Sequence, residues 1–209
     1  QSGVIAVSTS ALATILGTLC AIGLWRVSSK YSELVRAFLL LPLIIPQIIS
    51  AMAFYRLWIP LGLLDSYPGL ILAHTILAAP MVLITVSASL ATFDPKLEQA
   101  AATLGASRPW VFATVTLPMI LPGIIAGAIL AFAKAMGEFG ATITFAANIA
   151  GETRTLPIAI WTELQSPVGE PSAWRMTMLC VLVAILATLL CEFLVRRSSR
   201  SRAVEGAAR

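Results

Sequence analysis

Long runs without a charged residue are the feature that most constrains the fold of this chain. They cover residues 3–25, 37–55, 66–93, 109–133 and 176–191. Most of them approach or exceed the roughly 20 apolar residues that a helix needs to cross a bilayer. Only 11% of the 209 residues are charged, whereas soluble domains carry about 25%. We therefore predict an all-α, multi-pass membrane protein with about five transmembrane helices.

Two other classes of apolar sequence are excluded by the same runs. A membrane β-barrel would need alternating apolar and polar residues, and these runs do not alternate. A cleavable signal peptide would need a shorter apolar core preceded by basic residues, and the first run has neither property. Because Gln1 is not a start methionine, we expect a few native residues to precede it.

The distribution of Lys and Arg predicts the orientation in the membrane. Ten cations fall in the loops after the first and third runs and in the tail, against three on the opposite side. The side rich in Lys and Arg is normally cytoplasmic, so we expect the N-terminus outside and the C-terminus inside. We assign residues 1–197 to one membrane domain and 198–209 to a disordered basic cytoplasmic tail. Since the basic charge follows the topology, a nucleic-acid partner is not expected.

A polar segment at 93–118, FDPKLEQAAATLGASRPWVFATVTLP, separates the third and fourth runs. Asp94 and Pro95 predict the start of a short helix, and Gly105 predicts its end. Between them the side chains are small, and a second helix start follows at 107–109. A short cytoplasmic helix with a small-residue face suits docking into a groove of another protein.

This segment resembles the EAA loop of ABC-importer permeases, whose short cytoplasmic helix docks onto the ATPase subunit. The family pattern of Glu-Ala-Ala, Gly and Leu-Pro is matched at 99–101, 105 and 117–118, except that Gln replaces Glu. The resemblance implies a permease fold that forms half of a dimer. It also implies a set of ATPase-coupling residues: Glu98, Gln99, Ala100, Ala101, Gly105 and Pro118.

The region 93–196 is similar to the molybdate-importer permeases. The similarity rests on GEFGAT at 137–142, on Asn148 and on GETRTLP at 151–157. In that family the region lines the translocation path, and we expect the same here. The implied path residues are Glu138, Thr142, Thr144, Asn148, Thr153 and Thr155. The N-terminal half, with LPLIIP at 41–46, looks more like permeases for polyamines or ferric iron.

Ionisable groups inside the runs leave two interpretations open. Glu138 follows Lys134 by one helical turn, so the two side chains either neutralise each other or serve transport. A single acid beside a lysine favours an oxyanion over a dication, which needs carboxylates along its path. His74 either relays protons or, as we expect, hydrogen-bonds a neighbouring backbone or hydroxyl group.

No catalytic or metal-binding constellation appears in the sequence. There is no phosphate-binding loop ending in Lys-Ser/Thr, so we expect ATP hydrolysis in a separate subunit. The three cysteines, at positions 20, 180 and 191, have no metal-site spacing and are expected to be buried, reduced thiols that act as small hydrophobes. We predict no cofactor and no metal.

These observations predict an inner-membrane permease subunit of a bacterial ABC importer for molybdate or tungstate. The expected partners are a cytoplasmic ATPase, a periplasmic binding protein, a second copy of the chain and the bilayer. Sulfate, polyamine and ferric iron are alternative substrates. A transporter driven by an ion gradient is a less favoured class, because only His74 and the 134/138 pair offer coupling groups and no internal repeat is visible.

Overall fold

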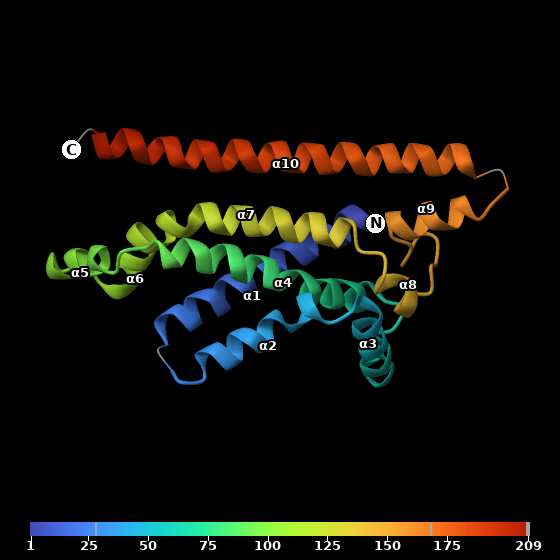
Figure 1. Ribbon diagram of the computed structural model, residues 1–209, viewed down its shortest axis with the longest axis horizontal. Helices are drawn as coiled ribbons and strands as arrows, with labels where there is room; N and C mark the ends of the chain where they lie inside the picture. Colours follow the sequence, from blue (N-terminus) through green and yellow to red (C-terminus); the bar gives the residue numbers. More distant parts are fainter. Residues whose placement is uncertain (28, 168, 208–209) are drawn as a thin grey trace.

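A computed structural model describes the backbone of residues 1–27, 29–167 and 169–207, and the side chains up to Phe193 except those at 28, 168 and 191. Within this part all regular structure is helical (Figure 1), which confirms the predicted fold class. The elements are α1 (Ser2–Arg26), α2 (Ser32–Ile44), α3 (Gln47–Leu61), α4 (Tyr67–Ala91), α5 (Lys96–Thr103), α6 (Arg108–Val111), the π-helical segment η1 (Phe112–Thr116), α7 (Leu117–Met136), α8 (Thr142–Phe145), α9 (Leu156–Leu164) and α10 (Glu170–Ala207).

Helix α4 is the centre of the packing and lies against α1 and α7. It buries apolar residues along its whole length, from Leu70 to Leu90. Glycines on the neighbouring helices permit this close approach. A Cβ added at Gly127 of α7 would lie 2.9 Å from the Val82 Cα, which is closer than real Cβ atoms come. Small residues at such contacts are the usual means of packing helices inside a membrane.

The second apolar run was predicted as one span, but the structure breaks it. Helices α2 and α3 meet at a bend of 103°. Pro46 has no backbone N–H to donate, and a proline disfavours the helical conformation of the residue before it. Ile45 is accordingly extended, with ψ 130°. The described chain therefore has four long helices able to cross a membrane, or five when the bent pair counts as one span.

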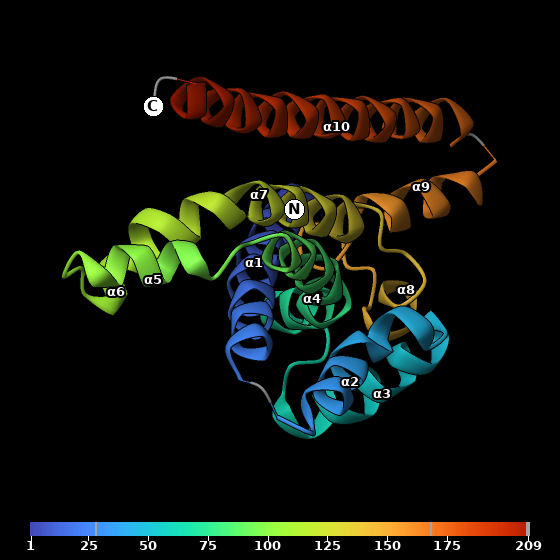
Figure 2. The same ribbon diagram turned by 60° about the vertical axis from the view of Figure 1, so that its left-hand side comes forward.

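The elements predicted to lie on opposite sides of the membrane are found at opposite ends of the molecule. Helices α5 and α6 and the turn after α1 lie toward one end, whereas the N-terminus, α8 and α9 lie toward the other (Figure 1). The α2–α3 pair projects from the bundle on the side away from α10 (Figure 2). The segments that carry Arg26, Lys96 and Arg108 thus lie toward one end, and which end faces the cytoplasm stays a prediction.

Helix α10 packs on α7 and α9 along one side of the bundle. Its backbone continues as helix to Ala207, well past the fifth apolar run. The division at residue 197 and a disordered state of the tail stay predictions. Cys20 and Cys180 are free, as expected, but they are half-buried rather than buried, and Cys191 lies outside the described side chains.

Candidate functional site

The predicted coupling segment forms a short helix closed by a glycine. Helix α5 begins at Lys96, one residue later than expected, and the Asp94 carboxylate accepts a hydrogen bond from the Lys96 amide at 2.9 Å. At the other end Gly105 has φ +84°. The Gly105 amide donates to the Ala102 carbonyl, and the Ala106 amide donates to the Ala101 carbonyl. These two bonds are the Schellman pattern, which explains the glycine at this position.

Glu98 points toward its own subunit. Its side chain is 18% exposed and forms a two-pronged pair with Arg26, at 2.8 Å and 3.3 Å between nitrogen and oxygen atoms. The hydroxyl of Thr116, on the π-helical segment, donates to the same carboxylate. Sequence reasoning missed both partners, because they lie 72 and 18 residues away and neither belongs to a motif.

The remaining coupling residues lie on the surface. Gln99, Ala100, Gly105 and Pro118 are exposed, and Ala101 is half-buried. Beside them Leu104 is 89% exposed, and Leu97 and Trp110 are also exposed. Between these residues and the end of α1 lies a hollow of about 660 Å³, and its lining includes Gln99, Ala102 and Arg108 as well as the paired Arg26 and Glu98. A projecting apolar side chain next to a hollow is typical of a docking surface.

Glu138 joins several elements at the opposite end of the bundle. Lys134 donates to its carboxylate at 2.5 Å, and the Ala141 amide donates at 3.0 Å. The Gln47 amide, at the start of α3, donates to it at 3.4 Å. The side chain is 1% exposed. The neutralising pair that the spacing suggested therefore forms. Through its bond with Gln47, the Glu138 carboxylate also connects the start of α3, just after the break, with the end of α7.

The predicted threonines of the path lie mostly inside the subunit. Thr142, Thr153 and Thr155 are buried, and Thr144 is half-buried. The Thr142 hydroxyl and the His74 Nε2 atom lie 2.8 Å apart, which confirms the expected hydrogen bond of the histidine. The Thr153 hydroxyl accepts from the Ile149 amide. These bonds give Thr142 and Thr153 an internal structural role in addition to any role in transport, whereas the buried Thr155 hydroxyl has no hydrogen-bond partner in the described part of the chain.

Asn148 belongs to a turn at the same end of the bundle. It has φ +54°, a conformation that asparagine tolerates better than most residues. Its side chain donates to the Thr162 hydroxyl and accepts from the Arg154 guanidinium at 2.8 Å. Sequence reasoning did not single out Arg154, which closes the turn on Asn148, while the Asn148–Thr162 bond holds the turn against α9.

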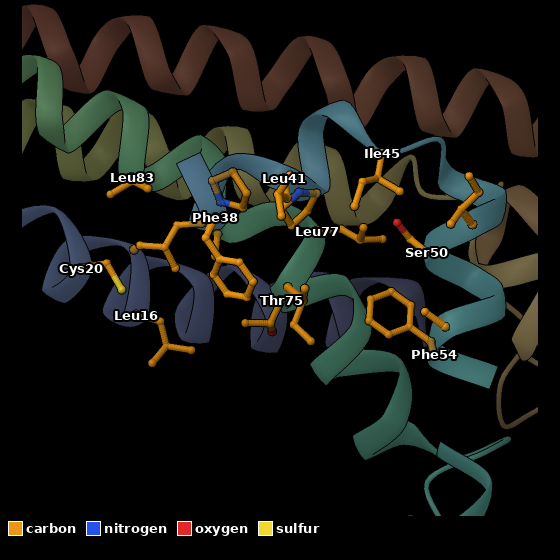
Figure 3. A pocket seen from close by; sticks show the side chains of 18 residues that line it. Leu16, Cys20, Phe38, Leu41, Ile45, Ser50, Phe54, Thr75, Leu77 and Leu83 are labelled. Atoms are coloured by element: carbon orange, nitrogen blue, oxygen red, sulfur yellow. The ribbon is translucent and has the colours of Figure 1, made fainter. Parts of the chain in front are cut away.

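A large apolar hollow of about 500 Å³ lies between α1, α4 and the α2–α3 pair (Figure 3). Phe38, Leu41 and Leu83 are among its lining side chains, together with the hydroxyls of Ser50 and Thr75. None of the six predicted path residues lines it. The side chains expected to form the path are therefore separate from this hollow, and their role in transport stays a prediction.

Comparison with solved structures shows the fold. The inward-facing MetNI methionine ABC transporter covers 94% of this chain with a TM-score of 0.77 and 18% identity, and 92% of that chain is matched. A bacterial ABC transporter that imports the acidic polysaccharide alginate also covers 94% of this chain, with 80% of that chain matched, a TM-score of 0.68 and 20% identity.

Curated relatives are closer in sequence. The molybdenum transport system permease protein ModB of Escherichia coli K12 is 47% identical over 146 residues, which are 70% of this chain and 63% of that protein. This chain thus spans somewhat less than two thirds of that relative. ModB of Mycobacterium tuberculosis H37Rv is 35% identical over 88% of this chain and 74% of its own length.

The family model called binding-protein-dependent transport system inner membrane component matches residues 13–200. That match includes the Gly105 turn and the 138–165 segment as well as the long apolar helices. The chain therefore belongs to the family of inner-membrane components of binding-protein-dependent transport systems.

Proposed function

We propose that this chain is the membrane-spanning subunit of an ATP-driven importer of molybdate or tungstate. The observation that carries the proposal is the 47% identity to a molybdenum permease over 70% of this chain. The pair between half-buried Lys134 and buried Glu138 supports it, because a neutralised carboxylate does not repel a dianion. Family membership also favours ATP over an ion gradient as the energy source.

The exposed part of the coupling segment is the proposed contact with a separate ATPase subunit. Leu104 is nearly fully exposed beside the exposed Leu97 and Trp110, so it belongs to an apolar surface patch of the kind that marks an interaction site. Its burial in a cleft of the ATPase would contribute on the order of 1.5–3 kcal/mol to docking. Since each chain presents one such segment, two ATPase subunits would need two copies of the chain, arranged around a two-fold axis.

A periplasmic binding protein would deliver the anion to the opposite end, where α8, α9 and the turn at 148–154 lie. ATP-driven movement of α5 in both subunits would then switch the opening of the path between the two sides. Along the path, the hydroxyl and amide groups of residues 142–155 would meet the oxyanion from both subunits. No cofactor is required by this proposal.

A polyamine is the second candidate substrate. The spermidine/putrescine permease PotC of Haemophilus influenzae is 26% identical over 95% of this chain. Reconstitution with the cognate ATPase and binding protein separates the candidates. We expect molybdate or tungstate to stimulate ATP hydrolysis and uptake, and sulfate and spermidine to have little effect.

Replacing Glu138 by Gln adds a second discrimination. For an oxyanion importer, Glu138→Gln leaves Lys134 positive and should retain anion uptake, although it disturbs local packing. For a polyamine importer, the same change removes an anionic contact and should abolish spermidine uptake. Spermidine uptake by the wild type that disappears in Glu138→Gln, without any molybdate uptake, would reject the oxyanion proposal.

A further inference from the structure

The cytoplasmic end of α1 makes two successive contacts with the coupling segment, one just before α5 and one in its first turn. The Trp25 ring packs edge-on against Phe93, with ring centroids 5.6 Å apart. The next residue, Arg26, pairs with Glu98 inside α5. Phe93 is buried, so the chain that leads into α5 is fixed against α1 by an apolar contact followed by a charged one.

The exit from the coupling segment is fixed to the same carboxylate. Thr116 is fully buried and lies at the end of the π-helical turn that leads into α7. Its hydroxyl and the Arg26 Nη2 atom both donate to the Oε1 atom of Glu98. One acidic group therefore connects α1, α5 and the start of α7, although these elements are far apart in the sequence.

The geometry of the pair distinguishes it from an ordinary surface ion pair. Arg26 uses two guanidinium nitrogens, a geometry that fixes direction as well as distance. By contrast, Arg36 and Glu33 on the same side of the membrane approach only to 4.0 Å, and Glu33 is 85% exposed. Such exposed pairs contribute little.

We infer that Glu98, although it lines the hollow beside α5, acts through Arg26 and Thr116 as a positioning residue that transmits movement of the coupling helix to α1 and α7, rather than as a contact to the ATPase. The inference rests on the proposed function, since it assumes that an ATPase moves α5. Gln99, which is exposed, remains on the docking surface. Movement of α5 would then displace the long core helices through Arg26 and Thr116 directly, in addition to pulling on the backbone.

The experiment uses the complex of this chain with its ATPase and binding protein in proteoliposomes. Three quantities are measured for each variant: ATPase retention on the purified permease, ATP hydrolysis, and anions transported per ATP hydrolysed. Arg26→Gln, Glu98→Gln and their double variant form a mutant cycle, and Thr116→Val tests the third partner. Glu33→Gln is the matched control, because it breaks a cytoplasmic ion pair outside the network.

We expect each change at Arg26 or Glu98 to lower transport per ATP by about three- to tenfold, the range typical of coupling networks, with ATPase retention unchanged. The double variant should be no worse than either single variant. The charge swap Arg26→Glu with Glu98→Arg should restore part of the ratio. Glu33→Gln should behave as the wild type.

Two results would overturn the inference. The first is loss of ATPase retention in Glu98→Gln but not in Arg26→Gln, which would make Glu98 a direct contact of the ATPase. The second is an additive double variant, which would remove the link between the two residues. Failure of the proposed function is recognised separately, because the wild-type complex would then show no anion-stimulated ATP hydrolysis.

Discussion

Replacing Gly105 measures the free-energy cost of a left-handed backbone conformation at a single residue, because no steric clash contributes to the result. Its φ is +84°, and a Cβ placed there would meet no atom within 4 Å. The cost of Gly105→Ala should therefore come from the left-handed conformation alone, about 1–2 kcal/mol. Helix α5 has eight residues and none of them is fully buried, so packing offers little compensation.

A loss of about 1 kcal/mol corresponds to a roughly fivefold fall in the equilibrium constant for closing the turn. Hydrogen exchange of the amides at 99–106, measured on the permease in lipid nanodiscs, should report this fall as faster exchange. Gly105→Asn should have a smaller effect, because asparagine tolerates positive φ. Transport should likewise fall more in Gly105→Ala than in Gly105→Asn.

Gly23 supplies the control for this measurement. A Cβ added at Gly23 would also meet no atom within 4 Å, but this residue lies within α1 and its φ is not positive. Gly23→Ala should therefore be neutral or should stabilise the helix, by up to about 1 kcal/mol. If Gly105→Ala leaves amide exchange as unchanged as Gly23→Ala does, the explanation of this turn by backbone conformation is refuted.

Three further outcomes are expected. A cysteine at Ser107 should react with an impermeant reagent only from the cytoplasmic side and one at Ser166 only from outside, and equal sidedness would contradict the predicted orientation. Gly127→Ala should lower the free energy of unfolding in detergent by about 1–3 kcal/mol through overpacking against α4, and an unchanged melting temperature would contradict the close approach. Thr142→Val should cost about 1–3 kcal/mol because it leaves His74 Nε2 without its partner. Thr144→Val, which removes only a bond to the Gly140 carbonyl, should cost less.

The sequence was sufficient for features that local chemistry determines. The apolar runs predicted the long helices, and positions 94–105 predicted α5 to within one residue, because caps and glycine turns act over a few residues. The 134/138 spacing likewise indicated the ion pair.

The features that were missed depend on tertiary structure. The charge-free run 37–55 indicated one span, because hydropathy shows how long an apolar segment is but not whether the helix bends within it. Only the structure shows the bend after Ile45. Glu98 was assigned to the ATPase from its place beside the motif. Its inward orientation depends on Arg26, 72 residues earlier, which no local pattern identifies.

The π-helical turn at Phe112–Thr116 has a consequence for the evolution of chain length in this region. Each residue of a helix turns the chain by about 100°, since a full turn takes 3.6 residues. A single deletion or insertion within the helical stretch 108–115 would therefore rotate the coupling segment around the axis of α7 relative to Thr116. Thr116 and Glu98 would then face different directions, so substitutions should be tolerated here more readily than changes in length.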